Sequence, residues 1–197
     1  ITTGPSGEEI HVDDLGRLKL RFFWDPSGVT DDRSSAWART VQWSQGGSMA
    51  LQRVGWEVPV MYLDGCPDRP IVLGRAYNTQ RPVPYGLPAS SAVSTLQSAT
   101  TPFDGTTNEI RMTDTAGSQE LRVQASRDQS VLVGGTADTT VGADETHDVG
   151  LMLAQVVLGS QSETIGGSRL ISIGTDWLSK IAGARTLTVG GMQHIEV

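Results

Sequence analysis

Valine or isoleucine occupies every eighth position along the last third of the chain. The series continues without a break through Val133, Val141, Val149, Val157, Ile165, Ile173, Ile181, Val189 and Val197. At most steps the next residue is glycine, namely Gly134, Gly142, Gly150, Gly166, Gly174 and Gly190, whereas Leu158 and Ala182 replace it at the two others. The positions between are mainly threonine, serine, aspartate, glutamine and glycine. This regular pattern indicates an internal repeat of eight residues, an octad.

An octad is long enough for one short strand and a corner, but it does not match the helical period of 3.6 residues. Valine and isoleucine favour strands, and glycine permits the backbone angles that a tight bend requires. We therefore predict one strand per octad, with its aliphatic side chain pointing inward and its glycine at a corner. The step also differs from the six-residue and nine-residue steps of other β-solenoids.

One octad supplies too little apolar surface to fold by itself. A fully buried valine or isoleucine contributes about 1.5–3 kcal/mol, whereas ordering the backbone costs about 1–2 kcal/mol for each of the eight residues. A single chain wound in this way also leaves its strand edges unpaired. We therefore predict a homotrimer, an intertwined triple-stranded β-helix that forms a prism around an aliphatic axis. A single-chain β-solenoid is the alternative, and it would need longer faces in each turn.

Alternating apolar and polar residues in the first 80 positions predict short strands. In the clearest of them, Leu18, Leu20 and Phe22 alternate with basic residues. Turn residues separate the four segments, which span 16–24, 37–44, 56–63 and 70–77. Short strands at this spacing predict a small antiparallel barrel of the OB type, although strand spacing alone does not distinguish it from an SH3-like barrel.

Composition divides the chain into three parts. We assign residues 1–80 to the barrel, residues 81–105 to an extended linker rich in proline, serine and threonine, and residues 106–197 to the octad-repeat needle. Within the needle, residues 108–123 predict two short strands around a turn at 114–117, which lead into the octads. The predicted fold class is therefore all-β.

The chain carries a net charge of −7, and most of this negative charge lies after Gly105. An acidic surface argues against a nucleic-acid partner, because binding phosphates requires basic residues. No apolar run reaches the 18 residues that a membrane-spanning helix needs. The lone Cys66 leaves no intrachain disulfide and is interpreted as an ordinary loop thiol.

No set of residues has the spacing of a catalytic or metal site. His11, His147 and His194 are dispersed, and the adjacent acid pairs at 13/14, 31/32 and 144/145 are interpreted as solvated turn residues. The sequence therefore predicts no enzyme activity and no cofactor. Two alternatives stay open. In the first, the barrel tryptophans either pack against strands or subunits, or form a surface that binds sugars or nucleic acid. In the second, His147, Gln155 and Glu163 either face solvent near corners, or point toward the axis and hold water or an ion.

Several segments, in order along nearly the whole chain, resemble one known family. They are residues 16–25 (GRLKLRFFWD), 37–39 (WAR), 55–58 (GWEV), 65–74 (GCPDRPIVLG), 77–78 (YN), 84–85 (PY) and 108–111 (NEIR), followed by the octads. They are similar to the valine–glycine repeat protein G family (VgrG), the spike of bacterial type VI secretion. The resemblance implies an OB-fold followed by a triple-stranded β-helix related to the needle of contractile phage tails. Cys66 departs from the family pattern, which more often has a small or acidic residue there.

The resemblance also implies a mechanical function, partners and a place of action. A trimeric spike made in the bacterial cytoplasm would be secreted through the type VI apparatus to the cell exterior or into target cells, piercing the target membrane and carrying effectors. Hub domains before Ile1 would seat it on the tube protein, and a tip-sharpening protein and effectors would follow Val197. The first alternative is a spike of a phage tail or other contractile injection particle; the second is a β-helical carbohydrate-active enzyme or adhesin.

Overall fold

The computed structural model describes residues 1–44 and 46–192. The chain divides into two compact units, unit 1 (Ile1–Thr136) and unit 2 (Ala137–Val197). Among the described residues, regular secondary structure consists of short β-strands and one 3-10 turn, η1 (Leu63–Gly65). The prediction of an all-β chain is confirmed.

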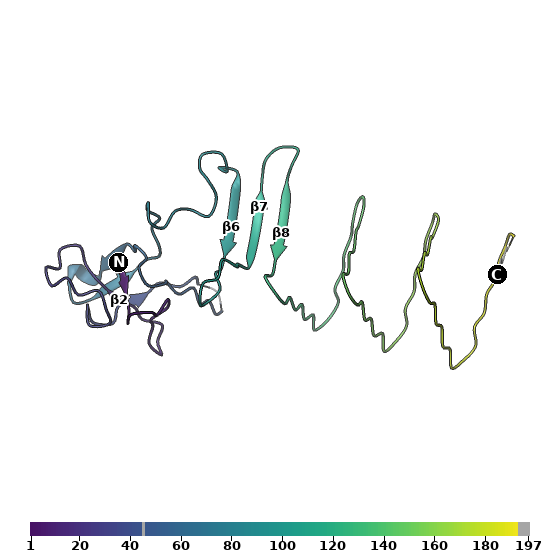
Figure 1. Cartoon of the computed structure of the whole chain (residues 1–197), viewed down its shortest axis with the longest axis horizontal. Coiled ribbons are helices and arrows are strands. Elements are labelled where there is room, and N and C mark those ends of the chain that lie inside the picture. The colour runs from purple at the N-terminus through teal and green to yellow at the C-terminus, as the bar shows by residue number, and fades with distance from the viewer. Residues whose placement is uncertain (45, 193–197) are drawn as a thin grey trace. The chain divides into compact units, whose positions relative to one another are not determined.

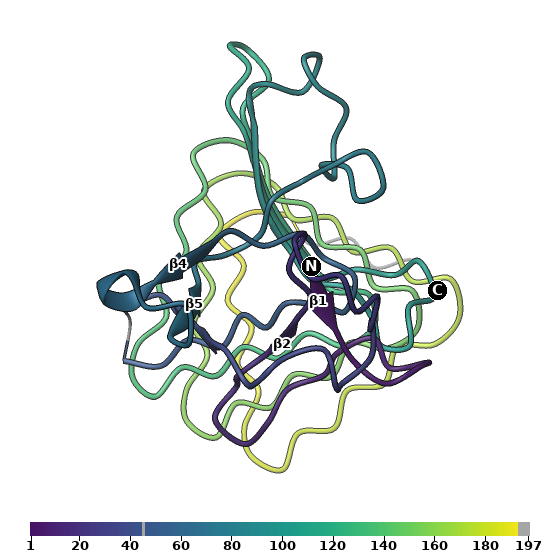
Figure 2. The ribbon, with the colours of Figure 1, turned by 90° about the vertical axis from the view of Figure 1, so that its left-hand side faces the viewer.

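Five short strands form the first part of unit 1. β1 (Thr2–Thr3) pairs antiparallel with β2 (Lys19–Leu20). β5 (Pro70–Val72) lies between β3 (Arg39–Thr40), to which it is parallel, and β4 (Val60–Tyr62), to which it is antiparallel. Figure 2 shows β1 beside β2 and β4 beside β5. Each of the four predicted segments contains one of β2 to β5, whereas the two-residue β1 is too short to give an alternating pattern.

Backbone hydrogen bonds join these strands into a continuous series. Leu18 and Ala38 exchange reciprocal N–H to C=O bonds of 2.8 Å, which link the start of β2 to the start of β3. The Thr2 N–H donates to the Trp56 carbonyl and the Gly55 N–H donates to the Thr2 carbonyl, both at 2.9 Å. These two bonds link β1 to the segment that precedes β4. The strands are thus linked in the order β1–β2–β3–β5–β4, and the segment before β4 bonds to β1. A closed OB-type barrel stays a prediction.

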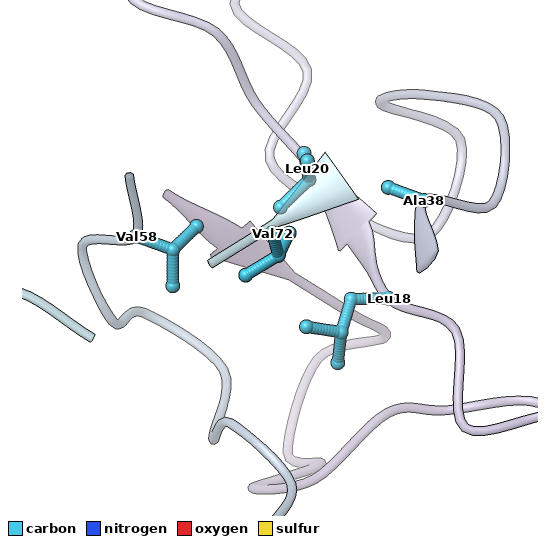
Figure 3. Packing of buried hydrophobic residues seen from close by; sticks show 5 residues of the cluster. All are labelled: Leu18, Leu20, Ala38, Val58 and Val72. Carbon is cyan, nitrogen blue, oxygen red and sulfur yellow. The ribbon is translucent and has the colours of Figure 1, made fainter. Parts of the chain in front are cut away.

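A small apolar core lies between these strands. Figure 3 shows its five buried side chains, Leu18, Leu20, Ala38, Val58 and Val72. Leu18 and Leu20 are the alternate apolar residues of the predicted strand at 16–24, and Phe22 packs against the same core. Lys19 lies between them, and its Nζ donates to the carbonyl of Ser35 at 2.7 Å. The period of two in the sequence therefore identifies the buried face of this strand correctly.

A second antiparallel sheet completes the regular structure of unit 1. In Figure 1, β7 (Glu109–Thr113) lies between β6 (Val93–Gln97) and β8 (Glu120–Gln124). β7 and β8 form the predicted hairpin, and Gly117 adopts a positive φ of 79° in its turn. β6 was not predicted, because residues 93–97 lie within the segment that we interpreted as a linker.

The described part of unit 2, residues 137–192, contains no strand and no helix. Figure 1 shows the chain, in green to yellow, winding through repeated open turns. The predicted octads therefore follow a regular path, although the single chain does not pair with itself along that path.

Candidate functional site: the octad ladder

The valine and isoleucine residues of the octads share one degree of exposure. These residues, here called the ladder (Val133, Val141, Val149, Val157, Ile165, Ile173, Ile181 and Val189), each expose 43–50% of their surface. Leu151, Leu158 and Leu170, which lie outside the ladder positions, expose 92–102%. Each ladder side chain is thus half-shielded by its own chain and half-open. Val197, the ninth member of the sequence pattern, and His194 lie outside the described residues.

The backbone of the same segment also lacks partners within the chain. Across residues 137–192, no backbone N–H donates to a backbone carbonyl of a described residue. A row of unpaired N–H and C=O groups along an extended segment is a template for pairing with another chain. The repeat therefore combines half-exposed aliphatic side chains, which can make further apolar contacts, with backbone N–H and C=O groups that can form further hydrogen bonds.

The glycines that follow the ladder residues have ordinary backbone angles in the single chain. None of Gly134, Gly142, Gly150, Gly166, Gly174 and Gly190 adopts a φ in the left-handed region, which is the region that favours glycine over other residues. An added Cβ at any of them would meet no heavy atom within 4 Å in the single chain. The role of these residues as corner glycines of the assembled repeat stays a prediction. Leu158 and Ala182 occupy the equivalent positions of two octads.

The polar residues that could face inward show no cluster of ligands. Glu163 forms an ion pair with Arg169, with 2.7 Å between Oε2 and Nη1, and both side chains are exposed. His147 and Gln155 are also exposed. Within the described part of the chain, no group of three or more histidine, cysteine, aspartate or glutamate residues could hold a metal ion.

A buried carboxylate network lies beside the hairpin that leads into the octads. Glu109 is only 6% exposed, and its Oε1 accepts hydrogen bonds of 2.6 Å from the hydroxyls of Tyr85 and Thr95. Arg111 donates to the Tyr85 hydroxyl at 3.3 Å and to Glu120 at 2.6 Å. The hydrogen bonds from Thr95 and Tyr85 hold the pKa of Glu109 below its ordinary value, because they favour the ionised carboxylate.

This network was missed by the sequence analysis, which placed Tyr85 only in a family-like segment. It connects β6, β7, β8 and the preceding loop, since its members come from all four. No pattern of apolar residues could indicate it, because a single glutamate in a strand ordinarily reads as solvent-facing.

A second polar link joins the barrel to residues 99–103 within unit 1. Arg53 forms an ion pair of 2.6 Å with Glu9, and its guanidinium also donates to the carbonyls of Ala99 and Thr100. Glu9 in turn accepts a bond of 2.8 Å from the backbone N–H of Phe103. The segment after β6 is therefore held against the barrel by charge-assisted hydrogen bonds.

The barrel tryptophans fall into two groups. The guanidinium carbon of Arg75 lies 3.8 Å from the ring centre of Trp56, and the Nζ of Lys19 lies 4.7 Å from the ring centre of Trp37. These two half-buried rings make cation–π contacts with neighbouring basic side chains. Trp24 and Trp43 are mostly exposed. Cys66 follows η1 as a half-buried free thiol, as expected for a loop cysteine.

Within the described residues, no helix has the length and apolar character needed to cross a membrane.

Comparisons with known proteins address both parts of the chain. Residues 94–197 match the family described as the bacteriophage T4 gp5 C-terminal trimerisation domain. The type VI secretion system spike protein VgrG1a of Pseudomonas aeruginosa is 43% identical over 149 residues, 72% of this chain and 23% of the relative. Spike protein VgrG1b of the same species is 42% identical over 157 residues, which are 76% of this chain and 20% of the relative.

A spike protein from a second organism gives the same result. VgrG3 of Vibrio cholerae is 42% identical over 133 residues, which are 66% of this chain and 13% of the relative. The chain thus spans about a fifth of the length of the curated relatives that it matches. The matched family covers the hairpin and all of the octads. The chain therefore belongs to the VgrG family of type VI secretion spike proteins, and its C-terminal half belongs to the gp5-type trimerisation domain family.

Proposed function

We propose that this chain forms the shaft of a trimeric cell-puncturing spike. The observation that carries the proposal is the combination found in residues 137–192, where half-open aliphatic side chains accompany a backbone without internal hydrogen bonds. Two further copies wound around the same axis would cover the ladder and pair the backbone groups of every octad. The match of residues 94–197 to a trimerisation domain supports the same stoichiometry.

The proposed geometry accounts for mechanical stiffness. In a three-chain helix, each octad rises by about one inter-strand spacing, roughly 4.8 Å, so that about eleven octads' length of chain from residue 106 would give a prism on the order of 50 Å long. Every interior backbone group would bond to a neighbouring copy, and no lateral edge would remain. A rod of this kind is suited to passing through an envelope under force.

The proposal includes the division of the chain and the partners of the full spike. Residues 1–80 form an OB-type barrel, residues 81–105 connect, and residues 106–197 form the needle. In the whole protein, hub domains link the spike to the tube protein, and a tip-sharpening protein and effectors bind at the distal end. The spike acts without catalysis after secretion through the type VI apparatus, and the relatives named above are described as spike proteins of that system.

A spike of a phage tail is the second candidate. The match to a bacteriophage T4 gp5 domain favours it, because that domain comes from a phage and a shaft of the same kind would fit a phage tail. Genes for tube and sheath proteins next to this one would identify the particle.

A delivery assay tests the proposed function in a bacterium that uses the full-length spike. Ile173→Asp places three carboxylates on the proposed axis, where unpaired charge costs several kcal/mol per group. Ser172→Asp adds the same charge to the adjacent outward position and is the matched control. We expect the ladder variant to abolish killing of target cells and the control to preserve it. Normal delivery by the Ile173→Asp spike would contradict the proposal.

A further inference from the structure

One octad differs from its neighbours in composition. Residues 151–158 read LMLAQVVL, in which Gln155 is the only polar residue. The preceding octad, 143–150, reads ADETHDVG, and the following octad, 159–166, reads GSQSETIG. Val157 is apolar because it occupies the ladder position, but the repeat pattern does not account for the other apolar residues of 151–158.

Three of these apolar side chains are among the most exposed in the repeat. Met152, Val156 and Leu158, here called the apolar collar, each expose 78–98% of their surface. The equivalent residues of the following octad are Ser160, Thr164 and Gly166, and those of the preceding octad are Asp144, Asp148 and Gly150. The collar therefore places large apolar groups at positions where both neighbouring octads carry small or polar ones.

Trimer formation would not cover the collar. Met152 and Val156 are separated from Val157 by an odd number of positions, so the alternation of strand side chains puts them on the face opposite the ladder. Leu158 takes the place of a corner glycine. This inference rests on the proposed trimer, in which the symmetry repeats the collar three times around the shaft. Exposed apolar patches of this kind mark interaction sites.

The charge around the collar specifies the partner. Between Arg127 and Arg169 the chain contains no lysine or arginine. The same stretch contains six acidic residues, namely Asp128, Asp138, Asp144, Glu145, Asp148 and Glu163. A partner with a basic border would meet complementary charge, whereas an anionic lipid surface would be repelled.

We propose that the apolar collar is a docking surface for a protein segment that presents aliphatic or aromatic side chains bordered by lysine or arginine. The apolar side chains of that segment would fill the collar, and its basic residues would pair with the acidic octads on either side. A protein carried on the outside of the shaft would bind in this way through a short amphipathic segment.

A three-residue variant provides the test. Met152→Ser, Val156→Thr and Leu158→Gly together give the octad the residues that the next octad of the same chain already has at these positions. The control, Leu170→Thr with Leu178→Thr, removes two exposed leucines elsewhere in the repeat. Light scattering measures the mass of each protein. Fluorescence anisotropy then measures binding of a labelled amphipathic leucine–lysine peptide and of a leucine–glutamate peptide with the same pattern.

We expect the leucine–lysine peptide to bind the unmodified trimer and the control, and to bind the collar variant at least about tenfold more weakly. Three results would overturn the docking surface. The first is that the unmodified trimer binds both peptides equally, and the second is that the leucine–lysine peptide binds the collar variant as well as the unmodified trimer. The third is that the collar binds phosphatidylglycerol vesicles and not the peptide. A trimer that binds neither peptide would overturn only this inference. An unmodified chain that is a monomer would overturn the proposed function as well.

Discussion

The residue that follows each ladder position indicates whether the backbone there requires glycine. Glycine is frequent there, yet none of the corner glycines described adopts a left-handed φ, and Leu158 and Ala182 occupy two of the corners. The corner conformation is therefore open to any L residue. The assignment of these positions as corners of the assembled repeat stays a prediction.

Gly166→Ala is expected to leave the protein as stable as before or to stabilise it slightly. Alanine reduces the conformational freedom of the unfolded chain, which adds about 0.4–1 kcal/mol per site when the native backbone accepts it. The added Cβ meets no atom of its own chain. The free energy of unfolding from denaturant titration checks this prediction, and a loss of more than about 1 kcal/mol would mean that the corner does require glycine.

The buried carboxylate of Glu109 is a second effect at the scale of one residue. Hydrogen bonds from Thr95 and Tyr85 lower its pKa in the folded chain below the ordinary value of 4.5. Its ionised form therefore adds stability at neutral pH, and this contribution is lost as the pH falls from about 4.5 through the lowered folded pKa.

Glu109→Gln should thus reduce the free energy of unfolding of unit 1 at pH 7 by about 1–3 kcal/mol, because a charge-assisted acceptor is replaced by a neutral one. The difference from the unmodified chain should shrink at pH 3. Denaturant titrations at both pH values measure it, with the exposed Asp68→Asn as the control. A difference that stays constant with pH would show that the charge of Glu109 does not matter.

Strands and their partners define the next scale, and here the sequence was informative in some segments only. Alternation around Leu18 and Leu20 identified the buried face of β2, and the residues around Gly117 identified the β7–β8 hairpin. β6 was missed, because its residues lie in a proline-rich segment and its identity depends on pairing with β7. The Glu109 network was missed for a related reason, since its partners are distant in sequence and meet only through sheet register.

The octads are the elements with the clearest sequence pattern, yet residues 137–192 do not pair with other described residues of the same chain. Backbone amides that bond to a neighbouring copy exchange slowly with solvent, whereas amides that face water exchange quickly. We expect hydrogen exchange to show strong protection along residues 139–189 in the assembled protein, comparable to β7. Fast exchange throughout the octads, together with a protected β7, would exclude the three-chain pairing.

At the scale of the whole molecule, one argument connects the repeat to its assembly. The ladder provides one large aliphatic side chain per octad, which in a single chain remains half-open. The backbone groups of the same residues lack internal partners. In the proposed trimer, the other two copies would cover the ladder side chains and pair with the backbone groups. Residues 94–197 match a trimerisation domain. The proposed function of a stiff spike follows from this proposed assembly.

The mass of the folded chain in solution tests the assembly most directly. The chain has a mass of 21.0 kDa, and size-exclusion chromatography with multi-angle light scattering measures the mass of the assembled particle. Our account predicts a folded species of three times the chain mass that does not dissociate on dilution. A folded, β-rich species with the mass of one chain would contradict it.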